Sequence, residues 1–304
     1  MTKKIAVIND LSGFGRCSLT AAISVISAMG IQACPLPTAI LTAQTGYPHY
    51  YLDDYTDKMD IYRQEWQKMG QHFDGIYTGF VASEAQIDQI FHFIDTFYTS
   101  DTFLLVDPVM GDDGIKYDMF TPKLLEKMNA LVREADIITP NLTELCLLTD
   151  ADYDAIIDIA DTRILIDVIG ELASTLLPPD SDNSNTLDSR QTSKKEKEII
   201  VTGIHCKNEH GQKMMGNLYV SKDTRKLFAF PHVGGSYSGT GDLFASCIAA
   251  GKCRGDGIPE LIQLSGTFLE QAIKDSAEEN VPYPDGTNYE KYLYMLIKNR
   301  VLTH

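Results

Sequence analysis

Short apolar runs alternate with longer segments of helical periodicity along most of the chain. Runs with the length of buried strands lie at residues 5–8, 32–37, 75–78, 103–106, 137–139 and 199–202. Helical spacing is found at residues 18–29, 55–69, 85–97, 122–132, 143–148, 157–177, 243–250, 259–274 and 289–297. The alternation predicts βαβ units and a mostly parallel sheet with helices on both faces. Two later runs, at residues 218–220 and 227–230, predict an antiparallel edge.

The regular alternation predicts one three-layer α/β/α domain over residues 1–304. Residues 178–198 interrupt it with a segment that is nearly free of apolar side chains and rich in Ser, Asp, Asn and Lys. Such a segment cannot bury enough surface to fold on its own. We therefore expect an exposed, mobile insertion within the domain.

Composition excludes several classes of function. The 42 acidic and 26 basic residues give a net charge of −16, so nucleic acid and anionic membrane are not expected as main partners, although a nucleotide is not excluded. The six cysteines form no CxxC pair, and the seven histidines show no metal-ligand spacing, so neither a zinc site nor a disulfide framework is indicated. Without a secretory signal or an apolar run of ~18 residues, we expect a cytoplasmic protein.

A glycine-rich turn meets a helical pattern near the C-terminal end of the chain. Gly239-Thr240-Gly241-Asp242 leads directly into the apolar helix predicted at residues 243–250. Glycines let the backbone approach a ligand, and a helix N-terminus adds free N–H groups, so together they form an anion site. An acid within an anion site suits a base that takes a proton while the N–H groups face a phosphoryl group. An equally open interpretation makes Asp242 the N-cap of the helix.

Polar residues also follow three of the predicted strands. Asp10 follows the first strand, Asp107 and Asp112 follow the strand at 103–106, and Asn141 and Glu144 follow the strand at 137–139. Ligands of open α/β sheets bind at the carboxyl ends of strands, and carboxylates suit magnesium. The alternatives are a turn role for Asp10, a surface turn around Asp112 and a helix-dipole role for Glu144.

Two further loops are candidate ligand sites. Gly13-Phe14-Gly15 lacks the third glycine and the later acid of a dinucleotide fingerprint. Residues 42–47 offer hydroxyl, amide and aromatic groups, which fit either a small aromatic ligand or a solvated loop.

Taken in chain order, these motifs resemble those of the ribokinase superfamily and, within it, the pyridoxal (vitamin B6) kinase group. The matching segments are residues 107–111, 138–141 with Glu144, and 239–242, and for the B6 group Gly15, residues 44–47 and residues 78–80. The resemblance covers nearly the whole chain. It implies a single α/β domain with a mostly parallel sheet, usually as a homodimer, and it implies ATP as donor with Mg²⁺, often with a monovalent cation such as K⁺.

The resemblance also implies a role for each matching residue. Asp242 would be the base that deprotonates the ring's hydroxymethyl group, and the amides of Gly239, Thr240 and Gly241 would form the anion hole. The residues that would bind magnesium, mostly through water, are Asp107 and Glu144. Those that would lie against ATP or its phosphates are Asp112, Asn141, Thr202 and Thr240. Those that would line the vitamer pocket are Asp10, Thr45 and Phe80.

The function implied is ATP-dependent phosphorylation of pyridoxal, pyridoxamine or pyridoxine at the 5′-hydroxymethyl group. Two positions depart from the B6 pattern, which carries Ser where this chain has Asp10 and often Tyr where it has Phe80. An acid at position 10 would pair with a protonated pyridine nitrogen or an amine, which favours pyridoxamine or an aminopyrimidine. The alternatives are therefore a hydroxymethylpyrimidine kinase of thiamine metabolism and, from another class, a non-catalytic vitamer or nucleotide sensor.

Overall fold

A central sheet organises the computed structural model, which describes residues 2–179 and 195–297. In these residues the main sheet has nine strands in the order β11-β10-β9-β8-β5-β4-β1-β2-β3. In this order, the neighbouring strands from β9 to β2 pair in parallel. At the two ends of the sheet, β10 pairs antiparallel with β9, and β3 pairs antiparallel with β2. The predicted fold class and the antiparallel edge formed by β10 and β11 are confirmed.

The elements have the following bounds. The strands are β1 (Lys4–Ser12), β2 (Gln32–Leu41), β3 (Leu52–Asp54), β4 (Gly75–Thr78), β5 (Phe103–Val106), β6 (Gly111–Asp112), β7 (Ile115–Lys116), β8 (Ile137–Ile138), β9 (Glu198–Lys207), β10 (Lys213–Val220) and β11 (Arg225–Pro231). The helices are α1 (Ser18–Ala28), α2 (Thr56–Lys68), α3 (Glu84–Phe97), α4 (Pro122–Glu134), α5 (Leu142–Thr149), α6 (Tyr153–Ile157), α7 (Thr162–Ser174), α8 (Thr240–Arg254) and α9 (Ile258–Glu278), followed by the 3₁₀ helices η1 (Tyr283–Asp285) and η2 (Tyr289–Leu296).

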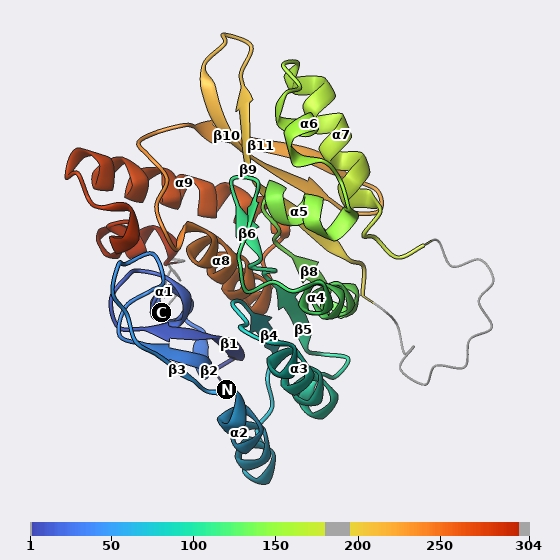
Figure 1. Cartoon of the computed structure of the whole chain (residues 1–304), viewed down its shortest axis with the longest axis vertical. Helices are drawn as coiled ribbons and strands as arrows, with labels where there is room; N and C mark the ends of the chain where they lie inside the picture. Colours follow the sequence, from blue (N-terminus) through green and yellow to red (C-terminus); the bar gives the residue numbers. More distant parts are fainter. Residues whose placement is uncertain (1, 180–194, 298–304) are drawn as a thin grey trace, which may run out of the picture.

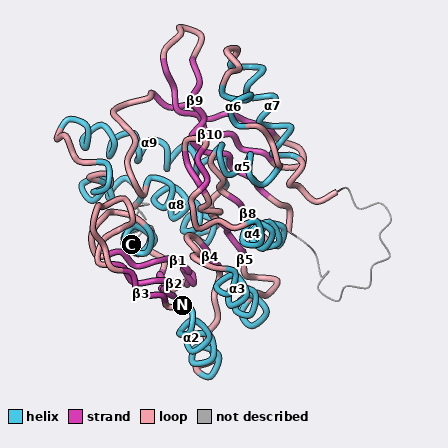
Figure 2. The backbone as a smooth tube through the Cα atoms, viewed as in Figure 1, coloured by secondary structure: helices cyan, strands magenta, loops and turns pink. Residues whose placement is uncertain are grey.

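Helices cover both faces of the sheet, so the strands are buried on both sides (Figure 1). Helices α1, α8 and α9 pack on one face, and α2, α3, α4, α5 and α7 pack on the other. Successive residues of a strand point to opposite faces of the sheet. On β4, Ile76 packs in the core on the side of α2, α3, α4, α5 and α7, whereas Tyr77 packs in the core on the side of α1, α8 and α9. Figure 2 shows the strands of the sheet between these two groups of helices.

Several predicted elements were wrong in extent or type, and β2, β9 and β10 are longer than predicted. The helix predicted at residues 157–177 is α7, which begins only at Thr162, because the carboxylate of Asp161 accepts the N–H groups of Arg163 and Ile164. Ile157 is instead the last residue of the separate helix α6. The segment predicted as a helix at residues 289–297 is the 3₁₀ helix η2. The first strand continues to Ser12, so Asn9 and Asp10 lie inside β1 at a shift in its register with β2. The short strands β3, β6 and β7 were not predicted.

The predicted insertion at residues 178–198 falls largely outside the described residues. Pro178 and Pro179 are exposed, as expected. Lys197 contradicts the expectation, because its side chain is buried and its ammonium group donates to the carbonyl of Val132. A long Lys side chain can bury its methylene groups when a carbonyl receives its charged end. Among the described helices, none combines the length and apolar character needed to cross a bilayer.

Candidate active site

The candidate site lies where the parallel strands end and helix α8 begins. The carboxyl ends of parallel strands share one edge of the sheet. Asp10 comes from β1, Asp107 follows β5 and Asn141 follows β8, so one sheet edge gathers residues that are far apart in the sequence. The start of α8 lies beside them, because α8 packs against α1, β1 and β4 (Figure 1).

The glycines at the start of α8 have distinct structural reasons. Gly239 is the N-cap with a φ of 82°, and a Cβ there would lie 2.1 Å from the carbonyl oxygen of Arg16 and 2.9 Å from Cys17 Cα. Only glycine lets the two loops approach this closely. A Cβ on Gly241 would meet nothing within 4 Å, so this part of the backbone faces open space.

The first turn of α8 is available to an anion. Among the described residues, no side chain caps the helix at Gly239. The first N–H groups of a helix have no partner within it, and the helix dipole adds positive charge at this end. A phosphoryl group is therefore a suitable occupant.

Asp242 lies within the first turn of α8, so the interpretation of this residue as the N-cap is wrong. Its carboxylate accepts the side-chain amide of Asn9 at 3.0 Å and the backbone N–H of Ser18. Burial raises its pKa to about 6, against the lowering effect of the Ser18 hydrogen bond, and the charge of Asp10 adds to the rise. A carboxylate with a pKa close to neutral is suited to act as a general base.

Asn9 holds three segments of the site together. Its Oδ1 accepts the backbone N–H groups of Asp10 and Phe80, each at 2.9 Å, while its Nδ2 donates to Asp242. A Cβ on Gly79 would lie 2.3 Å from Asn9 Nδ2, so glycine makes room for this amide. No role was predicted for Asn9, although its position directly after a buried apolar run was a signal.

Asp10 is buried beside Asp242 rather than exposed in a turn. Its Oδ2 accepts the hydroxyl of Ser12 at 2.8 Å. Burial raises its pKa, and hydrogen bonds from Ser18 and Ser12 oppose the rise. The turn interpretation of Asp10 is therefore wrong.

Two more buried carboxyl groups complete the acidic floor of the site. Asp107 accepts the hydroxyl of Thr139 at 2.8 Å, and burial together with the charge of Asp242 raises its pKa to about 7. Glu144 accepts the N–H of Met110 at 3.1 Å and that of Asn141 at 2.8 Å. Burial and the nearby Asp107 raise the pKa of Glu144 well above its usual value.

Asn141 and Glu144 form a capping box at the start of α5. The Asn141 side chain accepts the N–H of Glu144 at 2.9 Å, and its Nδ2 donates to the carbonyl of Gly111 at 2.8 Å. The spacing Asn-x-x-Glu is a helix-start signal in the sequence that the prediction of a helix-dipole role for Glu144 left out. Glu144 thereby joins the loop after β5 to the loop after β8.

The donor set fits a magnesium ion that is bound together with a nucleotide. No group of three or more His, Cys, Asp or Glu side chains in the described part of the chain could hold a metal alone. Asp107 and Glu144 offer two buried carboxylates near a helix N-terminus that suits phosphate. Magnesium commonly takes one or two protein carboxylates and completes its shell with water and substrate phosphates.

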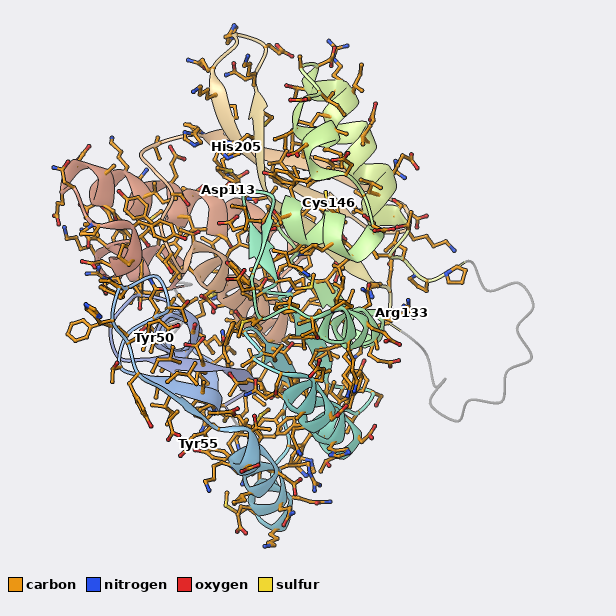
Figure 3. The ribbon with its side chains drawn as sticks, in the orientation of Figure 1. Tyr50, Tyr55, Asp113, Arg133, Cys146 and His205 are labelled. Carbon is orange, nitrogen blue, oxygen red and sulfur yellow. The ribbon has the colours of Figure 1, made fainter. Side chains whose placement is uncertain are left out.

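Three of the four residues predicted to bind ATP lie near one another at β6, β8 and β9, whereas Thr240 is the first residue of α8. Thr202 donates its backbone N–H to the carbonyl of Pro140 and forms a parallel β-bridge with Asn141. Asp112 is exposed on the β6–β7 hairpin. Asp112 and Asn141 line a cavity of about 110 Å³ together with His205. Figure 3 shows His205 close to Asp113 at the turn of this hairpin. Burial lowers the pKa of His205, and the charges of Asp113 and Asp112 oppose this effect.

The predicted vitamer residues are only partly brought together. Phe80 is half-buried and is linked to Asp10 through Asn9, and the Thr38 hydroxyl donates to its carbonyl at 3.1 Å. Thr45 is exposed on its loop. The neighbouring Gln44 connects that loop to the carbonyls of Phe14 and Pro284, so the loop lies over the turn that precedes α1.

Comparisons with known proteins agree with this arrangement. The profile of the phosphomethylpyrimidine kinase family matches residues 15–176 and 171–283. A "putative phosphomethylpyrimidine kinase" from Bacteroides thetaiotaomicron, crystallised with pyridoxal, is 33% identical with a TM-score of 0.82 over 97% of this chain and 96% of that one. Pyridoxal kinase from Lactobacillus plantarum is 25% identical with a TM-score of 0.80, over 97% of each chain.

The chain is also similar to two curated proteins that are named as putative pyridoxal kinases. The Schizosaccharomyces pombe protein named "putative pyridoxal kinase C18.10" is 28% identical over 194 residues, which are 63% of this chain and 50% of the relative. The chain thus spans about half the length of that relative. A second S. pombe protein, "putative pyridoxal kinase C6F6.11c", is 22% identical over 91% of this chain and 82% of its own length.

The fold, the glycine-rich helix start and the acids at neighbouring strand ends are those of the ribokinase-like α/β class of proteins. The expected resemblance to the ribokinase superfamily and its pyridoxal kinase group is confirmed by the relatives and neighbouring structures. The chain belongs to the phosphomethylpyrimidine kinase family.

Proposed function

We propose that this kinase transfers the γ-phosphoryl group of ATP to the 5′-hydroxymethyl group of a vitamin B6 vitamer. The observation that carries the proposal is a carboxylate, Asp242, with a pKa of about 6 in the first turn of an uncapped helix. A base and an anion site are thereby adjacent, as transfer to an alcohol requires.

Asp242 would take the hydroxyl proton as the bond to phosphorus forms. Asn9 and the N–H of Ser18 hold its carboxylate in one orientation. A primary alcohol is a poor nucleophile, and a positioned base typically accelerates such a step by about 10²–10⁴-fold.

The helix start would stabilise the charge on the transferring group. The amides of Gly239, Thr240 and Gly241 would face the phosphoryl oxygens, and donors placed in advance are worth more in a site that excludes water. Asp107 and Glu144 would hold magnesium, with Asn141, Asp112, Thr202 and Thr240 against the nucleotide. Magnesium neutralises phosphate charge during such transfers.

The proteins similar to this chain support a vitamer as the acceptor. The Bacteroides structure, which is 33% identical, was obtained with pyridoxal. Structures of Leishmania donovani pyridoxal kinase contain ADP with pyridoxamine or pyridoxine, although at 19% and 18% identity they inform only on the fold. Asp10 and Phe80 would lie against the ring, and Thr45 would close the pocket from its loop.

The test is phosphoryl transfer from ATP to a panel of pyridoxal, pyridoxamine, pyridoxine and hydroxymethylpyrimidine. We expect a phosphorylated B6 product with Mg²⁺ present and none when the metal is chelated. Binding of vitamers without turnover would contradict a kinase and support a sensor.

Hydroxymethylpyrimidine kinase is the second candidate, and one observation favours it. Asp10 is a buried acid where the B6 pattern carries Ser, and it would pair with an amine such as that of an aminopyrimidine. A higher kcat/KM for hydroxymethylpyrimidine than for every B6 vitamer would establish this alternative.

A further inference from the structure

Two buried hydroxyl groups lie in the core beneath the candidate site. They belong to Tyr77 on β4 and Ser246 on α8. Both residues have 0% of their surface exposed, and neither side-chain oxygen has a hydrogen-bond partner among the described residues. Buried polar side chains nearly always have such a partner, so two unpartnered hydroxyls at one place need an explanation.

The fold places both hydroxyls next to the acids. Strand β4 lies between β1, which contains Asp10, and β5, which Asp107 follows directly. Tyr77 points from β4 to the face of the sheet that α8 covers. Ser246 follows Asp242 by four residues, which puts the two side chains on the same face of α8, one turn apart.

The electrostatic effects agree with this placement. Burial raises the pKa of Tyr77, and the charges of Asp242, Asp107 and Asp10 raise it further. A hydrogen-bonding effect of Ser246 lowers it, so the two hydroxyls lie beside each other. Their oxygens nevertheless do not meet hydrogen-bond geometry. One internal water molecule would satisfy both, since buried waters typically bond about three polar groups.

We propose that Tyr77 and Ser246 are positioning residues for Asp242. With one internal water molecule they form a hydrogen-bond chain from the core to the inner side of the Asp242 carboxylate. The chain complements Asn9 and the Ser18 N–H, which hold the same carboxylate from β1 and α1. The inference rests on the proposed function, because it assigns Asp242 the role of base.

A positioning role differs measurably from simple packing. A donor to the carboxylate fixes its direction toward the acceptor hydroxyl and does not contact either substrate. Its loss should therefore reduce kcat and leave both KM values unchanged. A hydrogen bond to a charged group typically has an effect of about tenfold on the rate.

The experiment compares Tyr77→Phe, Ser246→Ala and the double variant with the wild-type enzyme. We expect kcat to fall about tenfold in each single variant and by about the same factor in the double variant, because all three break one chain. The matched control is Tyr219→Phe. Tyr219 is a buried tyrosine on β10 that donates to Glu198 at 2.9 Å, and its loss should leave kcat unchanged.

The pH dependence gives a second readout. Loss of a donor to the anion raises the pKa of Asp242, so the acid limb of kcat/KM should move to higher pH in Tyr77→Phe. The titratable groups that face Asp242 from the surrounding elements are Asp10, Cys17, Tyr77, Asp107 and Tyr117. Four of them are unchanged in the variant, so a shift of the limb reports the missing hydroxyl.

A kcat within about twofold of wild type in Ser246→Ala and Tyr77→Phe would overturn the inference, and so would an equal loss in Tyr219→Phe. If Tyr77→Phe does not fold, Ser246→Ala carries the test alone. Wild-type enzyme that phosphorylates no substrate would refute the proposed function instead. In that case, the titration of Asp242 in ¹³C-labelled ligand-free protein decides: a raised pKa in Ser246→Ala supports the chain, and an unchanged one overturns it.

Discussion

Replacing Asp242 by Asn should stabilise the folded protein while removing its proposed base. The pKa of Asp242 is about 6 in the folded protein against an ordinary 3.8, which at 1.36 kcal/mol per pKa unit amounts to about 3 kcal/mol at pH 7. Because the side chain keeps some exposure to solvent, we reduce this to about 2 kcal/mol.

The sign follows from the proton. The folded state holds the proton of Asp242 more tightly than the unfolded chain, so this group favours folding most below pH 3.8. Its contribution is lost as the pH rises through about 6. Asn carries no charge, but it offers only one acceptor to Asn9 and the Ser18 N–H, which costs about 1 kcal/mol. We expect a net gain of about 1 kcal/mol at pH 7 and a smaller one at pH ~5.5.

The assay is urea unfolding followed by circular dichroism at both pH values. The matched control is Asp53→Asn, which removes an exposed carboxylate of β3 and should change stability by less than about 0.5 kcal/mol. An Asp242→Asn protein that is less stable than wild type at pH 7 would refute the reasoning. A stability difference that does not change with pH would refute it as well.

Three further predictions concern other parts of the site. Gly239→Ala should lose at least about 2 kcal/mol of stability in thermal unfolding, because its Cβ would lie 2.1 Å from the Arg16 carbonyl oxygen. The control is Gly241→Ala, whose Cβ would meet nothing within 4 Å, and equal stabilities of the two variants would contradict this prediction. Asp10→Ser should raise kcat/KM for pyridoxal relative to pyridoxamine, and unchanged ratios would exclude a role in substrate choice. Glu144→Gln should raise the Mg²⁺ concentration for half-maximal rate about tenfold, and an unchanged requirement would remove it from the metal site.

The sequence predicted the layered fold well, because buried parallel strands produce short apolar runs that alternate with helices. It also predicted that Asp10, Asp107 and Asn141 lie at one edge, because strand ends converge there. The place of Asp242 beside them was implied by the family resemblance. It could not predict the bond between Asn9 and Asp242, which joins residues 233 positions apart. Such a contact depends on how α8 packs against β1, which no local pattern encodes.

Local patterns also failed where a polar residue had two interpretations. The apolar run at residues 5–8 predicts a strand that ends before Asp10, yet the strand continues to Ser12. Asp161 reads as one polar position in a long helix, yet its side chain begins a new one. The single domain over residues 1–304, the homodimer, the cytoplasmic location and the monovalent cation stay predictions.

The most direct test of the account is the single-turnover rate of phosphoryl transfer from ATP to pyridoxal in Asp242→Asn. Calorimetry would first establish that the variant binds both substrates with wild-type affinity. We expect a rate at least about 10²-fold below wild type, since only the proton acceptor has been removed. A rate within about threefold of wild type would contradict the role of Asp242 as the base.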